Sequence, residues 1–141
     1  MSLPMIDMPS ARPWPPRISA FTKPFWDALM QGRLITTRGK SSSRLTFPPK
    51  PFCPHDWGQV EWVELSGRGK LYAQTVIHAA PAAFAAEVPI RNGIVDLNEG
   101  LRIAARIVGK PALDAAVECV VLRYTDGPLF AFRAIEPADC L

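Results

Sequence analysis

The chain has 141 residues, 48% of them hydrophobic and 21% charged, which is typical of one globular domain or of two small ones that share a core. This balance excludes a chain that is disordered throughout, and no apolar run approaches the about 20 residues that a membrane-spanning helix needs. The net charge of +3 and the isoelectric point near 9.0 are modest for a chain of this size.

The three cysteines, Cys53, Cys119 and Cys140, form no disulfide framework, because they are few and odd in number. The N-terminus lacks the basic segment followed by an apolar segment that marks a secretory signal peptide. Both observations indicate a reducing compartment, so we expect a cytoplasmic protein.

The N-terminal part of the chain predicts an extended arm followed by one short helix. Residues 1–17 are rich in proline and show almost no periodicity, so we expect an arm that a partner orders. Thr22 fits the N-cap of a helix, and apolar residues recur at helical spacing from Phe25 to Met30. Gly32 ends this pattern, which gives a helix of about two to three turns.

Residues 33–57 predict two short extended arms, each with a tight turn, folded against one another; we call this segment the clip. Short strands are expected around the first turn, and a proline-rich connector leads to the second turn. The expected strands are residues 34–37 and 44–47, and the connector is residues 48–51. The two turns are residues 38–43 and 53–57. Because prolines stiffen the connector, they fix the distance between the two turns without a metal ion.

Two turns at this separation lie where a zinc ribbon places its paired ligands, and a structural zinc site needs four soft or borderline ligands in a tetrahedron. The corresponding positions are held by Gly39, Ser42, Cys53 and Asp56. Only one of them supplies a thiolate, and Gly39 has no side chain to ligate with. Cys53, His55 and Asp56 lie too close together in sequence to hold one ion without strain. We therefore expect no zinc and no other cofactor.

Without a metal ion, packing must stabilise the clip, since a structural ribbon usually depends on its metal for folding. We expect Trp57, which follows the fourth ligand position, to fill the space that the metal would occupy. The clip is then expected to pack on the rest of the protein through Phe47, Phe52 and Trp57.

From Gln59 onward, short runs rich in β-branched and aromatic residues alternate with turn residues. The expected strands are residues 60–65, 71–78, 90–97, 101–108, 118–124 and 129–134. Asn92-Gly93 by itself favours a hairpin turn, but the flanking strands would then be too short, so we expect one continuous strand, with or without a bulge at Gly93. This pattern favours a small OB-fold barrel, with a small sandwich as the alternative. The expected division is an arm (1–17), a helix with the clip (18–58) and the barrel (59–137).

Four motifs in this order resemble one family. They are Pro24-Phe25-Trp26 with Gln31-Gly32-Arg33-Leu34, then RLTFPP at 44–49, Cys53-Pro54-His55, and ELSGRGK at 64–70. Their order and spacing resemble the bacterial and archaeal acyl-CoA-associated family catalogued as domain of unknown function number thirty-five. That family pairs an N-terminal rubredoxin-like zinc ribbon with a C-terminal OB-fold, and the resemblance covers residues 21–135. It implies a mainly β protein in which a helix and a clip with a degenerate zinc site precede the barrel.

The resemblance also implies a function: a non-catalytic subunit that binds acyl-CoA and docks onto a thiolase, aldolase or hydratase. In the family, the N-terminal helical region contacts partner subunits or acyl chains, which would give Phe25 and Trp26 a second role besides core packing. Basic residues gather in or beside the clip and suit the phosphates of coenzyme A, although a plain solvated basic face is the alternative. The candidates for phosphate contacts, none of them assigned by a motif, are Arg44, Arg68, Lys70 and Arg91.

We expect no enzymatic activity from this chain alone. His55 and His78 fall in different elements, with no nucleophile beside either. The serines at 41–43 lack the Gly-x-Ser-x-Gly context of a nucleophile elbow.

Two other functions stay open from the sequence. In one, the barrel binds single-stranded nucleic acid by stacking bases on Tyr72, Phe84 and Tyr124, which are few for that purpose. In the other, the chain is a diverged relative that lost its function together with its metal ligands. No membrane contact is expected, and assembly with a second copy of the chain stays open.

Overall fold

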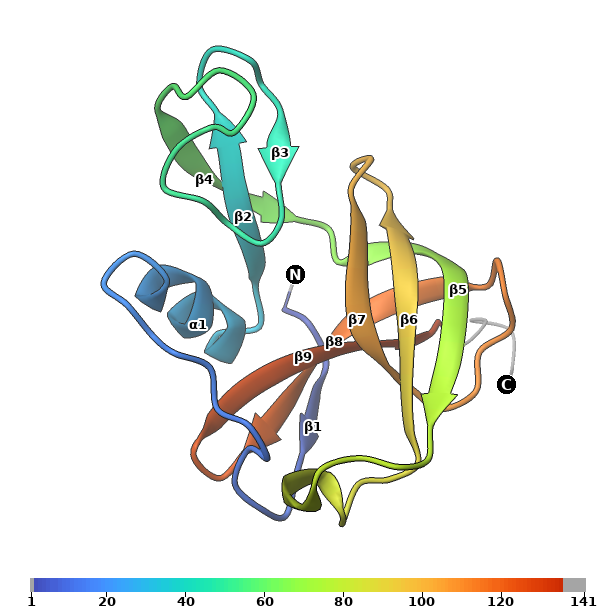
Figure 1. Cartoon of the computed structure of the whole chain (residues 1–141). Helices are drawn as coiled ribbons and strands as arrows, with labels where there is room; N and C mark the ends of the chain where they lie inside the picture. The colour runs from blue at the N-terminus through green and yellow to red at the C-terminus, as the bar shows by residue number, and fades with distance from the viewer. Residues whose placement is uncertain (1, 136–141) are drawn as a thin grey trace.

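The computed structural model of the protein describes residues 2–135, which form a β-barrel, a small three-stranded ribbon and one α-helix (Figure 1). The ribbon projects from the barrel at the upper left of Figure 1, and the helix lies below it. The mainly β fold expected from the sequence, an N-terminal helix and ribbon-like clip followed by an OB-fold barrel, is confirmed. Within residues 2–135, no helix is long and apolar enough to cross a membrane.

The barrel consists of strands in the order β5-β6-β7-β9-β8, and it closes because β8 pairs with both β9 and β5. Neighbouring strands are antiparallel except for β7 and β9, which run parallel. Closure removes the free sheet edges through which small β proteins otherwise associate. The strands are β5 (Arg68–Ile77), β6 (Ile90–Leu97), β7 (Arg102–Val108), β8 (Ala116–Tyr124) and β9 (Gly127–Ala134).

Side chains that face inward from alternate strand positions fill the barrel, among them the fully buried Leu71 and Phe132. The strand β6 is continuous, as expected, and it carries no bulge at Gly93. The register shift lies on the neighbouring strand, between Leu71 and Ala73. Gly93 is required by close packing, because a Cβ there would lie 2.7 Å from the carbonyl oxygen of Ala73.

The clip and the strand that follows it form a three-stranded antiparallel ribbon with β2 in its centre, so residues 60–65, expected as a strand of the barrel, pair with the ribbon instead. Its strands are β2 (Leu34–Gly39), β3 (Leu45–Thr46) and β4 (Val60–Leu65). Two buried threonines on β2 are satisfied by neighbouring backbone. Thr36 donates to the carbonyl of Thr46, and the hydroxyl of Thr37 accepts the N–H of Lys50 at 3.0 Å. These bonds tie the central strand to β3 and to the proline-rich connector.

The helix α1 (Lys23–Met30) joins the ribbon to the barrel, because it packs against β2, β8 and β9. Phe25 and Leu29 are 4% and 0% exposed and lie in the main core. The ring of Phe25 meets Phe47 of the clip and Phe130 of the barrel edge-on, with centroids 6.0 and 6.2 Å apart. Ribbon, helix and barrel therefore share one hydrophobic core.

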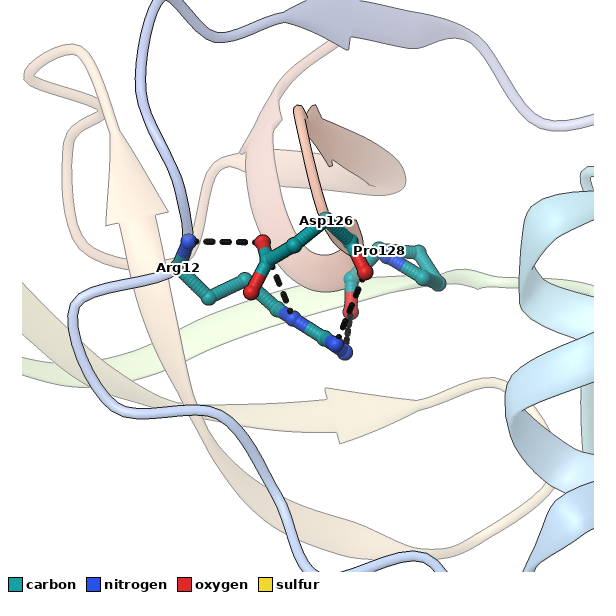
Figure 2. A network of polar contacts seen from close by, with 3 residues as sticks. All are labelled: Arg12, Asp126 and Pro128. Carbon is teal, nitrogen blue, oxygen red and sulfur yellow. Dashed lines mark hydrogen bonds and ion pairs between the residues drawn. The ribbon is translucent and has the colours of Figure 1, made fainter.

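The N-terminal segment, expected as an extended arm, lies along the barrel. The strand β1 (Met5–Asp7), which the sequence did not indicate, pairs in parallel with β8. Arg12 then fastens the segment to the turn between β8 and β9 (Figure 2). Its backbone N–H donates to Oδ1 of Asp126 at 2.8 Å, and its guanidinium donates to the carbonyls of Asp126 and Pro128 at 3.0 and 3.4 Å. Gly127 has a φ of 148°, which residues with a side chain rarely adopt, so this turn favours glycine.

Arg12→Ala is expected to lower the free energy of unfolding by about 1–3 kcal/mol, because it removes two hydrogen bonds and an ion pair from a side chain that is 9% exposed. Urea unfolding followed by tryptophan fluorescence measures this loss. Arg17→Ala is the matched control, since Arg17 is exposed and makes no side-chain hydrogen bond or ion pair with residues 2–135. An equal loss in both variants would contradict the anchoring role of Arg12.

Candidate functional site

The two turns of the clip have the same backbone geometry although they carry different side chains. In each, the fifth residue returns its N–H to the carbonyl of the first: Ser43 to Gly39 at 2.9 Å and Trp57 to Cys53 at 2.7 Å. The fifth residue has a positive φ in both turns, 61° at Ser43 and 59° at Trp57. Non-glycine residues adopt this conformation rarely, so its occurrence at both places shows that the turns are strongly determined.

The fourth residue of each turn also has the same role. Oγ of Ser42 accepts the backbone N–H of Arg44 at 3.2 Å, and Oδ1 of Asp56 accepts that of Gly58 at 2.8 Å. The hydrogen bond from the N–H of Gly58, and next the Cys53 thiol, hold the pKa of Asp56 below its usual range.

The structure brings the four degenerate ligand positions together around the buried Cys53. Its Sγ lies 3.3 Å from Oγ of Ser42, and its thiol contributes to the lowered pKa of Asp56. A Cβ on Gly39 would lie 2.5 Å from Oγ of Ser42 and 2.8 Å from this Sγ, so these two side chains already fill the space beside position 39. A hydrogen-bonded cluster occupies the centre where a zinc ribbon holds its ion.

These residues do not fit structural zinc. A glycine, a hydroxyl, a thiol and a carboxylate supply at most one soft ligand, and the favoured sets consist of thiolate and imidazole. His55, the only nearby imidazole, interacts through Nδ1 with a guanidinium nitrogen of Arg44 at 3.1 Å. Nowhere in residues 2–135 do three or more His, Cys, Asp or Glu side chains gather closely enough to hold an ion.

The prediction that Trp57 fills the space of the metal is wrong. Trp57 is 76% exposed and stacks on Phe52, which is 37% exposed, with ring centroids 4.8 Å apart. The positive φ of Trp57 turns its side chain away from the cluster, and the small thiol fills the centre in its place. Only Phe47 of the three expected aromatic residues packs on the core. We call Phe52 and Trp57 the aromatic tip.

The basic residues that were candidates for phosphate contacts do not converge. Arg44 lies in the clip beside His55, and Arg68 and Lys70 are exposed on β5. Arg91 lies on β6 and donates to the side-chain oxygen of Gln74 at 3.0 Å. Each remains a candidate, but the four form no single anion site.

Phe25 and Trp26 lie beside cavities, as a ligand role requires. Trp26 lines a cavity of about 350 Å³ between the barrel and residues 79–87, and we call this space the loop cavity. A second cavity, of about 420 Å³, lies between α1, the connector of the clip and β7, and both Phe25 and Trp26 line it. Most of the lining side chains in both are apolar.

A polar cluster in and beside the loop cavity was missed by sequence reasoning. Glu87 accepts hydrogen bonds from Arg106 and, at 2.9 Å, from the hydroxyl of Tyr124. Nη1 of Arg106 lies 3.3 Å from the hydroxyl oxygen of Tyr124, and both residues line the loop cavity. Burial, and then the hydrogen bond to Glu87, raise the pKa of Tyr124 to about 12. The only sequence signal was Glu87 itself, a lone charge that ends an alanine-rich run.

Comparison with known proteins agrees with this architecture. Residues 26–62 match the family model described as the ChsH2 rubredoxin-like zinc ribbon domain, and residues 62–123 match that of the ChsH2 C-terminal OB-fold domain. A DUF35 domain-containing scaffold protein of Methanocaldococcus jannaschii is 38% identical over 77 residues, which cover 53% of this chain and 55% of the relative. The chain belongs to the DUF35 family.

Other members carry names of enzyme subunits. The benzoylsuccinyl-CoA thiolase subunit BbsA of Thauera aromatica is 33% identical over 129 residues, covering 84% of this chain and 88% of BbsA. A probable enoyl-CoA hydratase alpha subunit of Thermomonospora curvata is 39% identical over 88 residues, or 60% of this chain and 27% of the relative. The chain thus spans about half of the M. jannaschii protein and about a quarter of the T. curvata protein.

Solved structures of the family have the same fold. The Ltp2-ChsH2(DUF35) aldolase superposes with a TM-score of 0.74 at 30% identity, covering 85% of this chain and 98% of that one. A DUF35 protein of unknown function from Sulfolobus solfataricus superposes with a TM-score of 0.57 at 14% identity, covering 80% and 84% of the two chains.

Proposed function

We propose that this DUF35 protein is a non-catalytic subunit that docks onto an enzyme acting on CoA thioesters, of thiolase, hydratase or aldolase type. The observation that carries this proposal is the aromatic tip, Phe52 stacked on Trp57 in solvent at the far end of the ribbon. The relatives named as subunits of a thiolase, of a hydratase and of an aldolase complex support it.

The aromatic tip has the chemistry of a binding hot spot. Tryptophan is among the residues whose truncation most weakens protein interfaces, and rigid aromatic side chains lose little conformational entropy on binding. The turn that carries Trp57 is fixed by hydrogen bonds to Gly58 and within the turn. A solvated tryptophan at such a fixed position contributes little to folding, so we assign Trp57 a role in contacting the partner enzyme.

The nucleophilic and acid–base groups support a non-catalytic role. The thiols of Cys53 and Cys119 are fully buried, and burial raises the pKa of Cys119 to about 12, so its reactive thiolate does not form near neutral pH. His55 is paired with Arg44 and is exposed. Within residues 2–135, no histidine hydrogen-bonds to a serine or cysteine side chain, as a histidine-activated nucleophile requires.

The same proposal includes acyl-CoA as the ligand, the cytoplasm as the location and a ribbon that folds without zinc. Burial of Cys53 and Cys119 as free thiols suits a reducing compartment. The contact between the buried thiol of Cys53 and the hydroxyl of Ser42, and the hydrogen bond of Asp56 with the backbone of Gly58, support the metal-free ribbon. Exposed Arg68 and Lys70, two residues apart on β5, are the best-placed pair for the phosphates of coenzyme A.

Single-stranded nucleic acid is a poorer fit to this surface. Tyr124 is 3% exposed, and Phe84 lines the loop cavity, so neither offers a stacking face to bases. Tyr72 is exposed, but the guanidinium of Arg102 lies 3.8 Å from its ring centroid and covers one face. Two of the three aromatic residues that would stack bases are therefore not available.

The proposal is tested by capture. A tagged full-length chain is expressed in its native host, and the proteins retained on it are identified by mass spectrometry and quantified against the tag alone. We expect a thiolase-, hydratase- or aldolase-type enzyme of CoA thioesters in near-equal amount to the bait. Retention of nucleic acid in place of such an enzyme would overturn the proposal.

A further inference from the structure

The loop cavity has the size and the wall of a binding site for a small apolar group. Its volume of about 350 Å³ lies at the lower end of the about 300–1,000 Å³ typical of ligand pockets. At about 30 Å³ for each water-sized group, it holds about twelve such groups. The large apolar side chains of its wall come from α1, from the loop and from the barrel: Trp26, Ile77, Phe84, Ile90, Leu129 and Phe130.

Polar donors are available on one side of this wall. Nη1 of Arg106 is used by Glu87 and Tyr124, but within residues 2–135 its Nε and Nη2 make no hydrogen bond. Asn92 also lines the cavity, and its side-chain amide makes no hydrogen bond within the same residues. The cavity therefore combines an apolar wall with a few unused donors, which is the usual composition of a ligand site.

The charges around the cavity select a neutral ligand group over an anion. The carboxylate of Glu87 pairs with Arg106 and offsets its charge. Tyr124 stays neutral, because its hydroxyl donates to Glu87 inside a largely buried environment. A carboxylate brought to this place would be repelled by Glu87, whereas a carbonyl oxygen accepts a hydrogen bond without adding charge.

We propose that the loop cavity binds the acyl end of a thioester, with the chain against the apolar wall and the carbonyl oxygen facing Arg106 and Asn92. The assignment to a CoA thioester, rather than to another apolar carbonyl compound, rests on the proposed function. A medium-length acyl chain of about eight carbons matches the available volume.

The probe for the test is the octanoyl thioester of N-acetylcysteamine, which carries the acyl end and the thioester but no nucleotide. The full-length chain is titrated by calorimetry and by backbone amide NMR, with octanoate and N-acetylcysteamine as comparison ligands. We expect saturable binding of the thioester, weaker binding of octanoate and none of N-acetylcysteamine. The amide signals of Phe84, Asn92 and Tyr124 should shift on binding.

A pair of variants on one loop tests the location. Ala80 lines the cavity and is half-buried, whereas Ala83 is exposed and lies outside the lining. Ala80→Phe should fill the space and weaken binding about tenfold or more, while Ala83→Phe should leave it unchanged. Absence of saturable binding, equal affinity in both variants, or tighter binding of octanoate than of the thioester would each overturn the inference.

The titration needs no partner enzyme, so its outcome is separate from that of the capture experiment. If the chain captures an enzyme but does not bind the thioester, only the assignment of the cavity is wrong. If the chain binds the thioester but captures no enzyme, only the docking role is wrong.

Discussion

Trp57→Ala is expected to weaken the complex with the partner enzyme by about 30- to 1,000-fold, which corresponds to the about 2–4 kcal/mol of a central hot spot. The reason is that Trp57 presents the largest exposed apolar surface of the ribbon and stacks only on Phe52. The thermal midpoint of the free chain should stay unchanged, because the side chain is 76% exposed and contributes little to the core. Biolayer interferometry with the captured enzyme and a thermal melt measure the two quantities.

Trp14→Ala is the control for this result. Trp14 is 71% exposed like Trp57, but it lies on the N-terminal segment. Its loss should leave the affinity for the enzyme unchanged. If Trp57→Ala lowered the thermal midpoint and left the affinity intact, the aromatic tip would be a structural element and the docking assignment would be wrong.

Restoring three cysteines to the clip is expected to create a zinc site and to raise the stability of the chain strongly. The variant carries Gly39→Cys, Ser42→Cys and Asp56→Cys beside the native Cys53. The backbone of both turns already has matching hydrogen bonds and a positive φ after the fourth position. Structural zinc supplies about 10–16 kcal/mol of apparent binding free energy in small zinc-finger peptides, so even a part of that would dominate other changes. Elemental analysis should find one zinc ion per chain of the triple variant. Its thermal midpoint should fall when a chelator is added.

The double variant Ser42→Cys with Asp56→Cys is the matched comparison. It supplies three thiolates and keeps Gly39, so it should bind zinc more weakly than the triple variant. The native chain should bind no zinc, and its midpoint should not respond to chelator, since Cys53 is the one soft ligand among the four positions and its thiol already contacts Ser42. Stoichiometric zinc in the native chain, or none in the triple variant, would contradict this description of the clip.

Features encoded locally could be predicted from the sequence. Runs rich in β-branched residues between turn residues indicated β6 and β7, and the spacing of the two turns indicated a ribbon with a degenerate metal site. The four ligand positions do meet, because each turn is determined by its own residues and the strands place the turns together.

Features that depend on distant residues could not be predicted. Glu87, Arg106 and Tyr124 are 18 to 37 positions apart and meet only because the barrel closes. The strand β1 is too short for periodicity to show and gains its partner from β8, more than a hundred residues later. Trp57 was misplaced for a different reason: apolarity indicates burial in general, but the backbone of this turn points the side chain outward.

Hydrogen exchange on the complex with the captured enzyme tests the docking claim most directly. Amide exchange in the segment 50–60 is compared between the free chain and the complex, with the exposed hairpin turn at Asn98-Glu99-Gly100 as internal reference. We predict strong slowing of exchange around Phe52 and Trp57 and none at the reference turn. Unchanged exchange around the aromatic tip, with slowing elsewhere on the barrel, would contradict the role of the ribbon as the docking element.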